Sequence, residues 1–462
     1  MGNSFVIKTK HLIRTKHLKY WAIMLLMCFM IIVRNVLSVQ FPIFFFLPVG
    51  FLLCLLCERN EIVAFMCSMA PFENTFQFRY MILIGALFLL IKSKRFRFSN
   101  LLPIVLMMLC EILHFTGGEI PMASFLREFG VLVSLGIVLV VKPIDSSDGL
   151  TMRSVASMVL FASIITVIVN RGLTGFSFSS SDRLGSTYDM VESYNALLNP
   201  NVGSFLCVLS ICGLVLLIRS GNKSRVDTPL LVGLAVFILL FQSKAAIISL
   251  VFAAIIYLYA NNKNWVLPTL RALGILFIFG VLAFIFFRNT INAIIIRFVV
   301  GDFSTGRIGI FAFYQHYLFS DIKNLLFGCG LYNYAERIAS YYSSGALAAS
   351  GAVTYINHYM TLLVSHNNIQ EILIVWGIPG VLLVLWLLNK MIKHKKMGRN
   401  ILQYLAFDFV LLYTLQGQLI SSSVALTALI FSLVCMEYEC PKLLMLGMSN
   451  TISAKTSSRS LL

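Results

Sequence analysis

The sequence predicts an all-α fold, a polytopic bundle of about 12–14 transmembrane helices with a large, partly helical outer loop. Of the 462 residues, 59% are hydrophobic and only 12% are charged, far outside the range of soluble globular proteins. Apolar stretches long enough to cross a hydrocarbon core recur along the chain, for example at 155–169, 267–287 and 369–388. Lysine and arginine cluster in short loops between them, as in membrane proteins. No soluble domain of ordinary size is left over.

The predicted spans follow one another closely in the first two thirds of the chain. They lie near 20–38, 41–57, 61–72, 76–91, 101–116, 123–141, 151–170, 201–218, 229–242, 244–260, 267–288, 368–389, 401–418 and 420–437. The third is short enough to be interfacial or re-entrant instead of spanning.

The distribution of positive charge predicts the orientation. A basic run at 8–19 precedes the first span without a small-residue cleavage site, which indicates an uncleaved signal anchor. With the amino terminus in the cytoplasm, most of the 36 Lys and Arg residues fall in cytoplasmic loops, and both termini are cytoplasmic. The positive residues behind the net charge of +17 are therefore explained by the orientation of the chain in the membrane, and we expect no nucleic-acid partner.

These features divide the chain into six parts. They are N-terminal transmembrane helices at 1–170, a first long outer loop at 171–200, central transmembrane helices at 201–288, a large outer loop at 289–366, C-terminal transmembrane helices at 367–440 and a cytoplasmic tail at 441–462. Outer loops of this length usually carry function. In the second, apolar and aromatic spacing predicts helices at 306–319 and 333–342, with a break at Gly328-Cys329-Gly330 between them.

Three cations on the predicted outer face are candidate phosphate ligands. Arg183 lies in Ser-Asp-Arg-Leu-Gly, Arg307 follows Ser-Thr-Gly, and Lys244 follows Gln242-Ser243 between two apolar runs. Guanidinium groups bind phosphate with a planar fork, and small neighbours let the backbone approach a ligand. Arginines at helix ends, such as Arg288, have the alternative of reaching lipid head groups. A polyanionic lipid head group such as a pyrophosphate would suit the three candidates.

His366 is the candidate general base. It precedes Asn367 and an apolar helix, where lipid ends and water begins, and a near-neutral pKa suits proton transfer. A satisfied interfacial histidine is the structural alternative. His316 and His358 share the outer loop, but their spacing matches no compact ligand motif and no Asp-x-Asp pair accompanies them. We therefore predict no metal and no cofactor.

Ionisable residues inside the spans are costly in hydrocarbon and should face the bundle interior. They are Glu111, His114, Glu371 and Asp408. Glu371 follows His366 by about one and a half turns, so it could tune the site, although structural pairing is its more usual role. Trp376-Gly377-Ile378-Pro379-Gly380 interrupts the helix after His366, which indicates a kink with close helix packing.

An ordered set of these motifs resembles the O-antigen ligase and polymerase superfamily of bacterial polysaccharide enzymes. The set is Arg183 upstream of Asn199-Pro200-Asn201, Ser243-Lys244-Ala245-Ala246, Ser304-x-Gly306-Arg307, Leu326-Phe327-Gly328-x-Gly330, and His366-Asn367 before Gly377-x-x-Gly380. The resemblance covers roughly 171–390, and the first 150 residues match only in hydropathy. The chain departs from the family at Val375-Trp376, where an acidic residue often precedes the Gly-x-x-Gly.

The resemblance implies a metal-independent inverting glycosyltransferase with a GT-C-like fold in the bacterial inner membrane, active on the periplasmic face. Its donor and acceptor would be oligosaccharides linked to undecaprenyl pyrophosphate. Arg183, Arg307 and Lys244 would hold the donor pyrophosphate, and His366 would deprotonate the acceptor hydroxyl. Asn367 would position that hydroxyl, and Asn201 and Tyr332 are further candidate substrate contacts. Membrane lipid and a chain-length regulator protein are the other expected partners.

Within this superfamily, polymerase and ligase differ only in the acceptor. A polymerase extends a lipid-linked repeat unit, whereas a ligase transfers the glycan to lipid A core. The divergent sequence and the tyrosine-rich outer loop favour polymerase, since tyrosine rings can stack on sugars, although the tyrosines could equally form an interfacial belt. A lipid-linked oligosaccharide flippase or transporter is the alternative from another class, but neither the broken helices at the membrane midplane nor the repeat symmetry typical of transporters is visible in the sequence.

Overall fold

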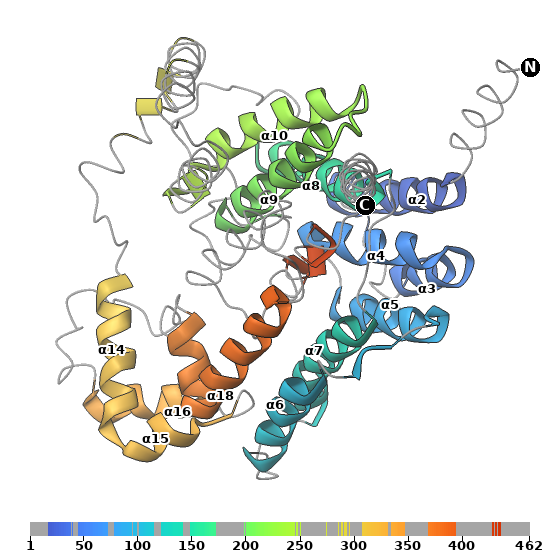
Figure 1. Ribbon diagram of the computed structural model, residues 1–462. Helices are drawn as coiled ribbons and strands as arrows, with labels where there is room; N and C mark the ends of the chain where they lie inside the picture. The colour runs from blue at the N-terminus through green and yellow to red at the C-terminus, as the bar shows by residue number, and fades with distance from the viewer. Residues whose placement is uncertain are drawn as a thin grey trace, which may run out of the picture.

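The protein is helical throughout the part that its structure describes. The computed structural model describes residues 17–37, 45–72, 78–94, 96–98, 101–114, 122–141, 148–171, 200–244, 307–330, 334–346 and 368–393, together with isolated residues elsewhere. Within these ranges every regular element is a helix, in agreement with the predicted all-α class (Figure 1).

Ten helical elements make up the described part before residue 244. They are α2 (Leu18–Asn35), α3 (Phe46–Leu56), α4 (Arg59–Ser68), η2 (Ala70–Phe72), α5 (Phe78–Lys92), α6 (Leu101–His114), α7 (Met122–Val141), α8 (Leu150–Arg171), α9 (Pro200–Arg219) and α10 (Asp227–Phe241). Each overlaps a predicted span, so the hydropathy pattern located the helices correctly. α8 packs against α4, α9 and α10, and α5 packs against α3, α4 and α7.

Three described helices are long and apolar enough to cross a membrane. They comprise Leu18–Asn35, Leu150–Val169 and Asn201–Ile218, of 18, 20 and 18 residues. At a rise of about 1.5 Å per residue, each is about as long as a hydrocarbon core is thick. The described chain is therefore an α-helical protein with helices of membrane-spanning type.

The predicted third span is α4, which has only 10 residues and reaches about 15 Å. Glu58 and Glu61 form a capping box at its start, and its residues from Glu61 to Ser68 are all buried. The segment is thus a short internal helix, too short by itself to cross a bilayer.

A chain of hydroxyl groups joins α2, α4 and α8 inside the core. Ser68 donates to the Ala64 carbonyl at 2.6 Å, and the Ser154 hydroxyl lies 2.7 Å from Ser68. Tyr20 in turn contacts Ser154. Because each hydroxyl donates once, the direction of donation is fixed from Tyr20 through Ser154 and Ser68 to the carbonyl. Burial of these polar groups is offset by their mutual hydrogen bonds.

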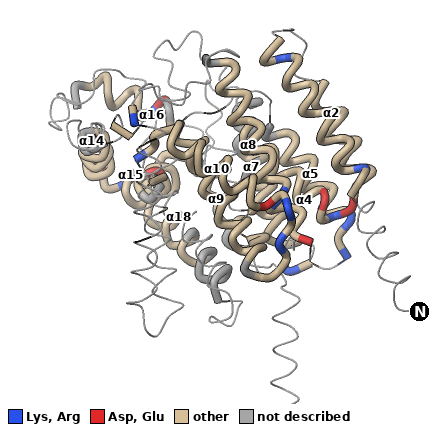
Figure 2. Tube along the Cα trace, turned by 90° about the horizontal axis from the view of Figure 1, so that it is seen from above, with Lys and Arg blue, Asp and Glu red and all other residues tan. Residues whose placement is uncertain are grey.

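Two pairs of helix ends meet through positively charged side chains. Lys92, at the end of α5, donates to the Cys54 carbonyl at 2.8 Å, at the end of α3. Arg59, at the start of α4, donates to the Val141 carbonyl at 2.7 Å, at the end of α7. In Figure 2 much of the blue and red in this part of the chain gathers near such ends. These are the ends that the charge pattern assigned to one side.

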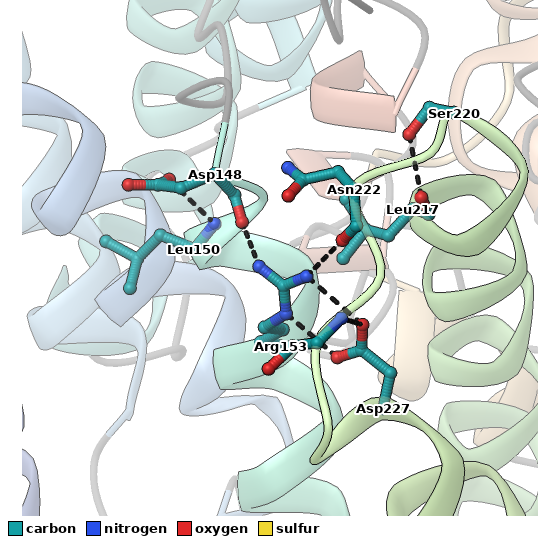
Figure 3. A network of polar contacts seen from close by, with 8 residues as sticks. Asp148, Leu150, Arg153, Leu217, Ser220, Asn222 and Asp227 are labelled. Atoms are coloured by element: carbon teal, nitrogen blue, oxygen red, sulfur yellow. Dashed lines mark hydrogen bonds and ion pairs between the residues drawn. The ribbon is translucent and has the colours of Figure 1, made fainter. Parts of the chain in front are cut away.

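Two clusters of charged side chains lie at the ends of helices in this part of the chain. His17 bonds to the carboxylates of Glu61 at 2.7 Å and Asp148 at 2.8 Å, and these two contacts raise the pKa of His17 to about 9. Arg153 of α8 donates to the fully buried Asp227 at 2.8 and 3.1 Å. Arg153 also binds the carbonyls of Asp148 and Asn222, which joins α8 to the α9–α10 turn (Figure 3).

The second described part consists of residues 307–330, 334–346 and 368–393. It contains α14 (Arg307–Ser320), α15 (Ile322–Phe327), α16 (Tyr334–Tyr341), the π-helical turn η5 (Tyr342–Ala346) and α18 (Asn368–Lys393). The helices predicted at 306–319 and 333–342 are confirmed as α14 and α16, while α15 was not predicted. α14 and α15 pack on α18, and α18 packs on α6 (Figure 1).

This part has a small core of its own. Its buried members are Ile310, Phe313, Tyr314, Tyr317, Leu318, Cys329, Ile338 and Ile374. The residues come from α14, from the segment after α15, from α16 and from α18. Their spacing in α14 is helical and leaves Gln315, His316, Phe319 and Ser320 exposed on the other side.

Candidate functional site

The structure describes three of the seven predicted site residues. His366, Asn367, Arg183 and Tyr332 lie outside the described residues, and Arg307 is described only through its backbone, as the first residue of α14. Asn201 and Lys244 are described with their side chains.

Asn201 and the 242–244 step, far apart in the sequence, meet at one end of α9 and α10. The Ser243 hydroxyl donates to Asn201 Oδ1 at 3.1 Å. Pro200 starts α9, where its missing N–H costs nothing and its fixed φ favours the helix. Asn201 is thereby held at the end of α9, beside the half-buried Lys244. Two predicted substrate contacts thus share one location.

A close approach of the two helices fixes this location. A Cβ on Gly203 would lie 2.5 Å from the Phe241 ring, so only glycine allows α9 to come this near. α10 then ends at Gln242, whose backbone is left-handed, with φ 51° and ψ 38°. Non-glycine residues rarely adopt this conformation. The cap is held by the Gln242 N–H, which bonds to the Ile238 and Leu239 carbonyls at 3.2 Å.

Two buried polar side chains at this location lack hydrogen-bond partners within the described chain. They are Gln242, 3% exposed, with both amide atoms unpaired, and Ser204, fully buried, with its hydroxyl unpaired. Sequence reasoning did not select either residue. The only signal was Gln242 itself, a polar residue at the junction of two apolar runs.

A second location joins the start of α14 to the start of α18. The Gln370 side-chain amide donates to the Phe311 carbonyl at 3.2 Å. Arg307 is one helical turn before Phe311, and His366 precedes Gln370 by four positions in the sequence. The described neighbours of the predicted phosphate ligand and of the predicted base are therefore in contact.

Backbone contacts between two glycine motifs hold α15 against α18. The N–H groups of Cys329 and Gly330 donate to the carbonyls of Ile374 and Val375 at 2.7 and 2.8 Å. Pro379 has no N–H, so it leaves the Val375 carbonyl without its usual helical donor. The helix breaks at Gly377, with φ 64° and ψ −161°. The predicted kink is confirmed, and the carbonyls next to it accept hydrogen bonds from the segment after α15.

The two glycines at this contact tolerate no side chain. A Cβ on Gly328 would lie 2.5 Å from the Val375 carbonyl, and a Cβ on Gly377 would lie 2.5 Å from the Leu326 carbonyl. The sequence motifs Leu326-x-Gly328-x-Gly330 and Gly377-x-x-Gly380 are thus two halves of one backbone junction.

Two buried carboxylates flank the junction. Trp376 Nε1 donates to Glu111 Oε1 at 2.5 Å, and Glu111 and Glu371 are each 3% exposed. The prediction that both face the interior is confirmed. Glu371 Oε2 has no hydrogen-bond partner in the described ranges. The His114 side chain and Asp408 lie outside the described residues.

A tyrosine pair adjoins Glu371. Tyr334 donates to the Tyr314 hydroxyl at 2.9 Å, and the two rings are parallel, with centroids 6.4 Å apart. Burial, with smaller contributions from Tyr314 and Glu371, raises the pKa of Tyr334 well above its usual value. The hydroxyl therefore remains protonated and acts as a hydrogen-bond donor.

The fold and these sites define an α-helical protein with membrane-type helices and buried polar groups at helix junctions. No protein-family model matches the sequence, and a comparison with curated proteins finds no match.

Proposed function

We propose that this chain is a polytopic membrane glycosyltransferase, a surface-polysaccharide polymerase of the O-antigen ligase and polymerase type. It transfers an undecaprenyl-pyrophosphate-linked glycan onto a lipid-linked repeat unit at the outer face of the bacterial inner membrane. The supporting observation is that motifs carrying the resemblance meet in space. Asn201 contacts Ser243 beside Lys244, and Leu326-x-Gly328-x-Gly330 joins Gly377 through the backbone.

Binding of the donor falls to the cations in this proposal. Arg183, Arg307 and Lys244 hold the pyrophosphate and stabilise the charge that develops as it leaves. The hydrogen bond between Gln370 and the Phe311 carbonyl brings the starts of α14 and α18 into contact, which supports the proposal that Arg307 and His366 act together.

His366 is the general base in this proposal. It accepts the proton of the acceptor hydroxyl as the oxygen attacks the anomeric carbon, with inversion. Asn367 orients the hydroxyl. The bond from the anomeric carbon to the pyrophosphate oxygen breaks as the new glycosidic bond forms, and the lipid pyrophosphate leaves.

Replacement of His366 by alanine tests the proposal. A strain carrying His366→Ala should display single repeat units, while His316→Ala, a change of the same residue type in the same outer segment, should leave the chain-length distribution unchanged. His316 is bonded to Tyr341 within the outer segment and has no role in the proposed chemistry.

Other outcomes of the same experiment separate the remaining functions. Long glycans that are made but not attached to lipid A core would indicate a ligase, and intermediates trapped on the cytoplasmic face would indicate a flippase. An unchanged distribution with normal expression of the variant would refute the catalytic assignment.

A further inference from the structure

We infer that Gln242 and Ser204, at the junction of α9 and α10, form a binding site for a sugar hydroxyl group, adjacent to the Lys244 ammonium. The inference rests on the proposed function and deepens it, because it assigns recognition of the sugar next to the donor phosphate to two residues that no motif selected.

The two side chains belong to one location. Gly203 touches the Phe241 ring, and Asn201 accepts from Ser243, so α9 and α10 run in opposite directions here with matching positions side by side. Ser204 lies on the same face of α9 as Asn201, since residues three apart in a helix are neighbours. Gln242 directly precedes Ser243.

The chemistry of the unpaired atoms selects the ligand class. Gln242 Nε2 can only donate, Gln242 Oε1 can only accept, and the Ser204 hydroxyl can do both. A metal ion would leave Nε2 unpaired, and a simple anion would leave Oε1 unpaired. A hydroxyl group donates and accepts at once, so it satisfies this set, and sugars present such groups in pairs.

The backbone supports a functional reading over a structural one. An unpaired buried amide costs stability, and the left-handed backbone of Gln242 adds strain. Both the unpaired amide and the left-handed backbone of Gln242 therefore lower the stability of the fold. Strain and unpaired polar groups in a folded protein are typical of places where a ligand completes the hydrogen bonds.

Lys244 would bind the phosphate next to the sugar that Gln242 and Ser204 recognise. Lys244, a half-buried residue, follows Gln242 by two positions. An ammonium binds phosphate as a point charge. A sugar phosphate can therefore place its anion at Lys244 and a ring hydroxyl at Gln242 and Ser204.

Thermal unfolding of the purified full-length protein in detergent tests the inference. The probes are N-acetylglucosamine 1-phosphate and, at the same concentration, inorganic phosphate. We expect the sugar phosphate to raise the unfolding midpoint of the wild-type protein more than phosphate does, because a ligand that binds only the folded state stabilises it.

The variants are Gln242→Met and Ser204→Ala, which remove the polar groups at nearly constant volume. In both, the two probes should give equal shifts, and the midpoint without probe should equal or exceed that of the wild type, since an unpaired buried group has been removed. Ser210→Ala is the matched control. Ser210 is also buried in α9, but its hydroxyl bonds to the Leu206 carbonyl at 2.7 Å, so the sugar-dependent shift should persist.

Three results would overturn the inference. They are equal shifts from both probes in the wild type, a sugar-dependent shift that survives Gln242→Met, and a lower midpoint in both variants without probe, which would show that ordered water pairs these atoms. Failure of His366→Ala to alter glycan length, with the sugar-dependent shift intact, would instead refute the proposed reaction and leave the binding site.

Discussion

Substitution of Gly377 by alanine should destabilise the protein strongly, because the junction between α15 and α18 has no room for a side chain. The backbone of Gly377, at φ 64° and ψ −161°, lies in a region essentially restricted to glycine, where another residue costs of order 1–3 kcal/mol. A Cβ would also lie 2.5 Å from the Leu326 carbonyl carbon and oxygen, which are main-chain atoms and cannot rotate away.

Relief of that overlap separates the two segments and breaks their hydrogen bonds. Two bonds join them, from Cys329 to Ile374 and from Gly330 to Val375. Each contributes a net ~0.5–1.5 kcal/mol. Added to the backbone strain, the expected loss in the free energy of unfolding is roughly 2–6 kcal/mol.

Unfolding of the purified protein by titration with a denaturing detergent, followed by circular dichroism, measures this loss. Gly274→Ala is the control, because a Cβ at Gly274 meets no described atom within 4 Å and its backbone φ is not positive. The double variant Gly328→Ala/Gly377→Ala should be less destabilised than the sum of the single variants, since either change alone opens the same junction. A Gly377→Ala protein as stable as Gly274→Ala would refute the reasoning.

Two further predictions concern the charge clusters around Arg153 and His17. Arg153→Ala should reduce the free energy of unfolding by about 3–5 kcal/mol, because it leaves the Asp227 carboxylate buried without its cation. Denaturant titration measures this loss. A loss no larger than that of Lys323→Ala, a change at an exposed site, would contradict the prediction. Since the pKa of His17 rises from 6.5 to about 9 on folding, the stability contributed by its protonated form is fully present below pH 6.5 and lost as the pH rises through 9. Unfolding midpoints across this range should fall more steeply for the wild type than for His17→Gln, and parallel curves would contradict the assignment.

Local patterns in the sequence located most of the described helices. Apolar runs bounded by glycine, proline and basic residues predicted the bounds of α8 and α9 to within one residue. The Gly377-Ile378-Pro379 run predicted the break in α18. α15 was missed because it has only six residues, although Asp321 signalled its start as an N-cap whose carboxylate accepts from the Lys323 N–H.

Pairings between distant segments were beyond the sequence. The sequence indicated that Gly328 and Gly377 each interrupt a helix. It did not indicate that the carbonyls next to Gly377 accept hydrogen bonds from the N–H groups after Gly328, because this pairing depends on tertiary geometry. Likewise Asn201 and Lys244 were selected separately, and their common location follows from the approach of α9 to α10 at Gly203. The unpaired amide of Gln242 has no signature in composition or spacing, since it becomes visible only when neighbouring atoms can be counted.

The junction at Gly377 is made almost wholly of main-chain atoms, and this affects how freely the sequence of α15 can vary. Ile322 and Phe327 on α15 are 62% and 61% exposed and take no part in holding it. Replacement of such residues leaves the anchoring bonds in place. Related chains could therefore vary the exterior of this segment freely during evolution while its attachment to the long helix stays constant.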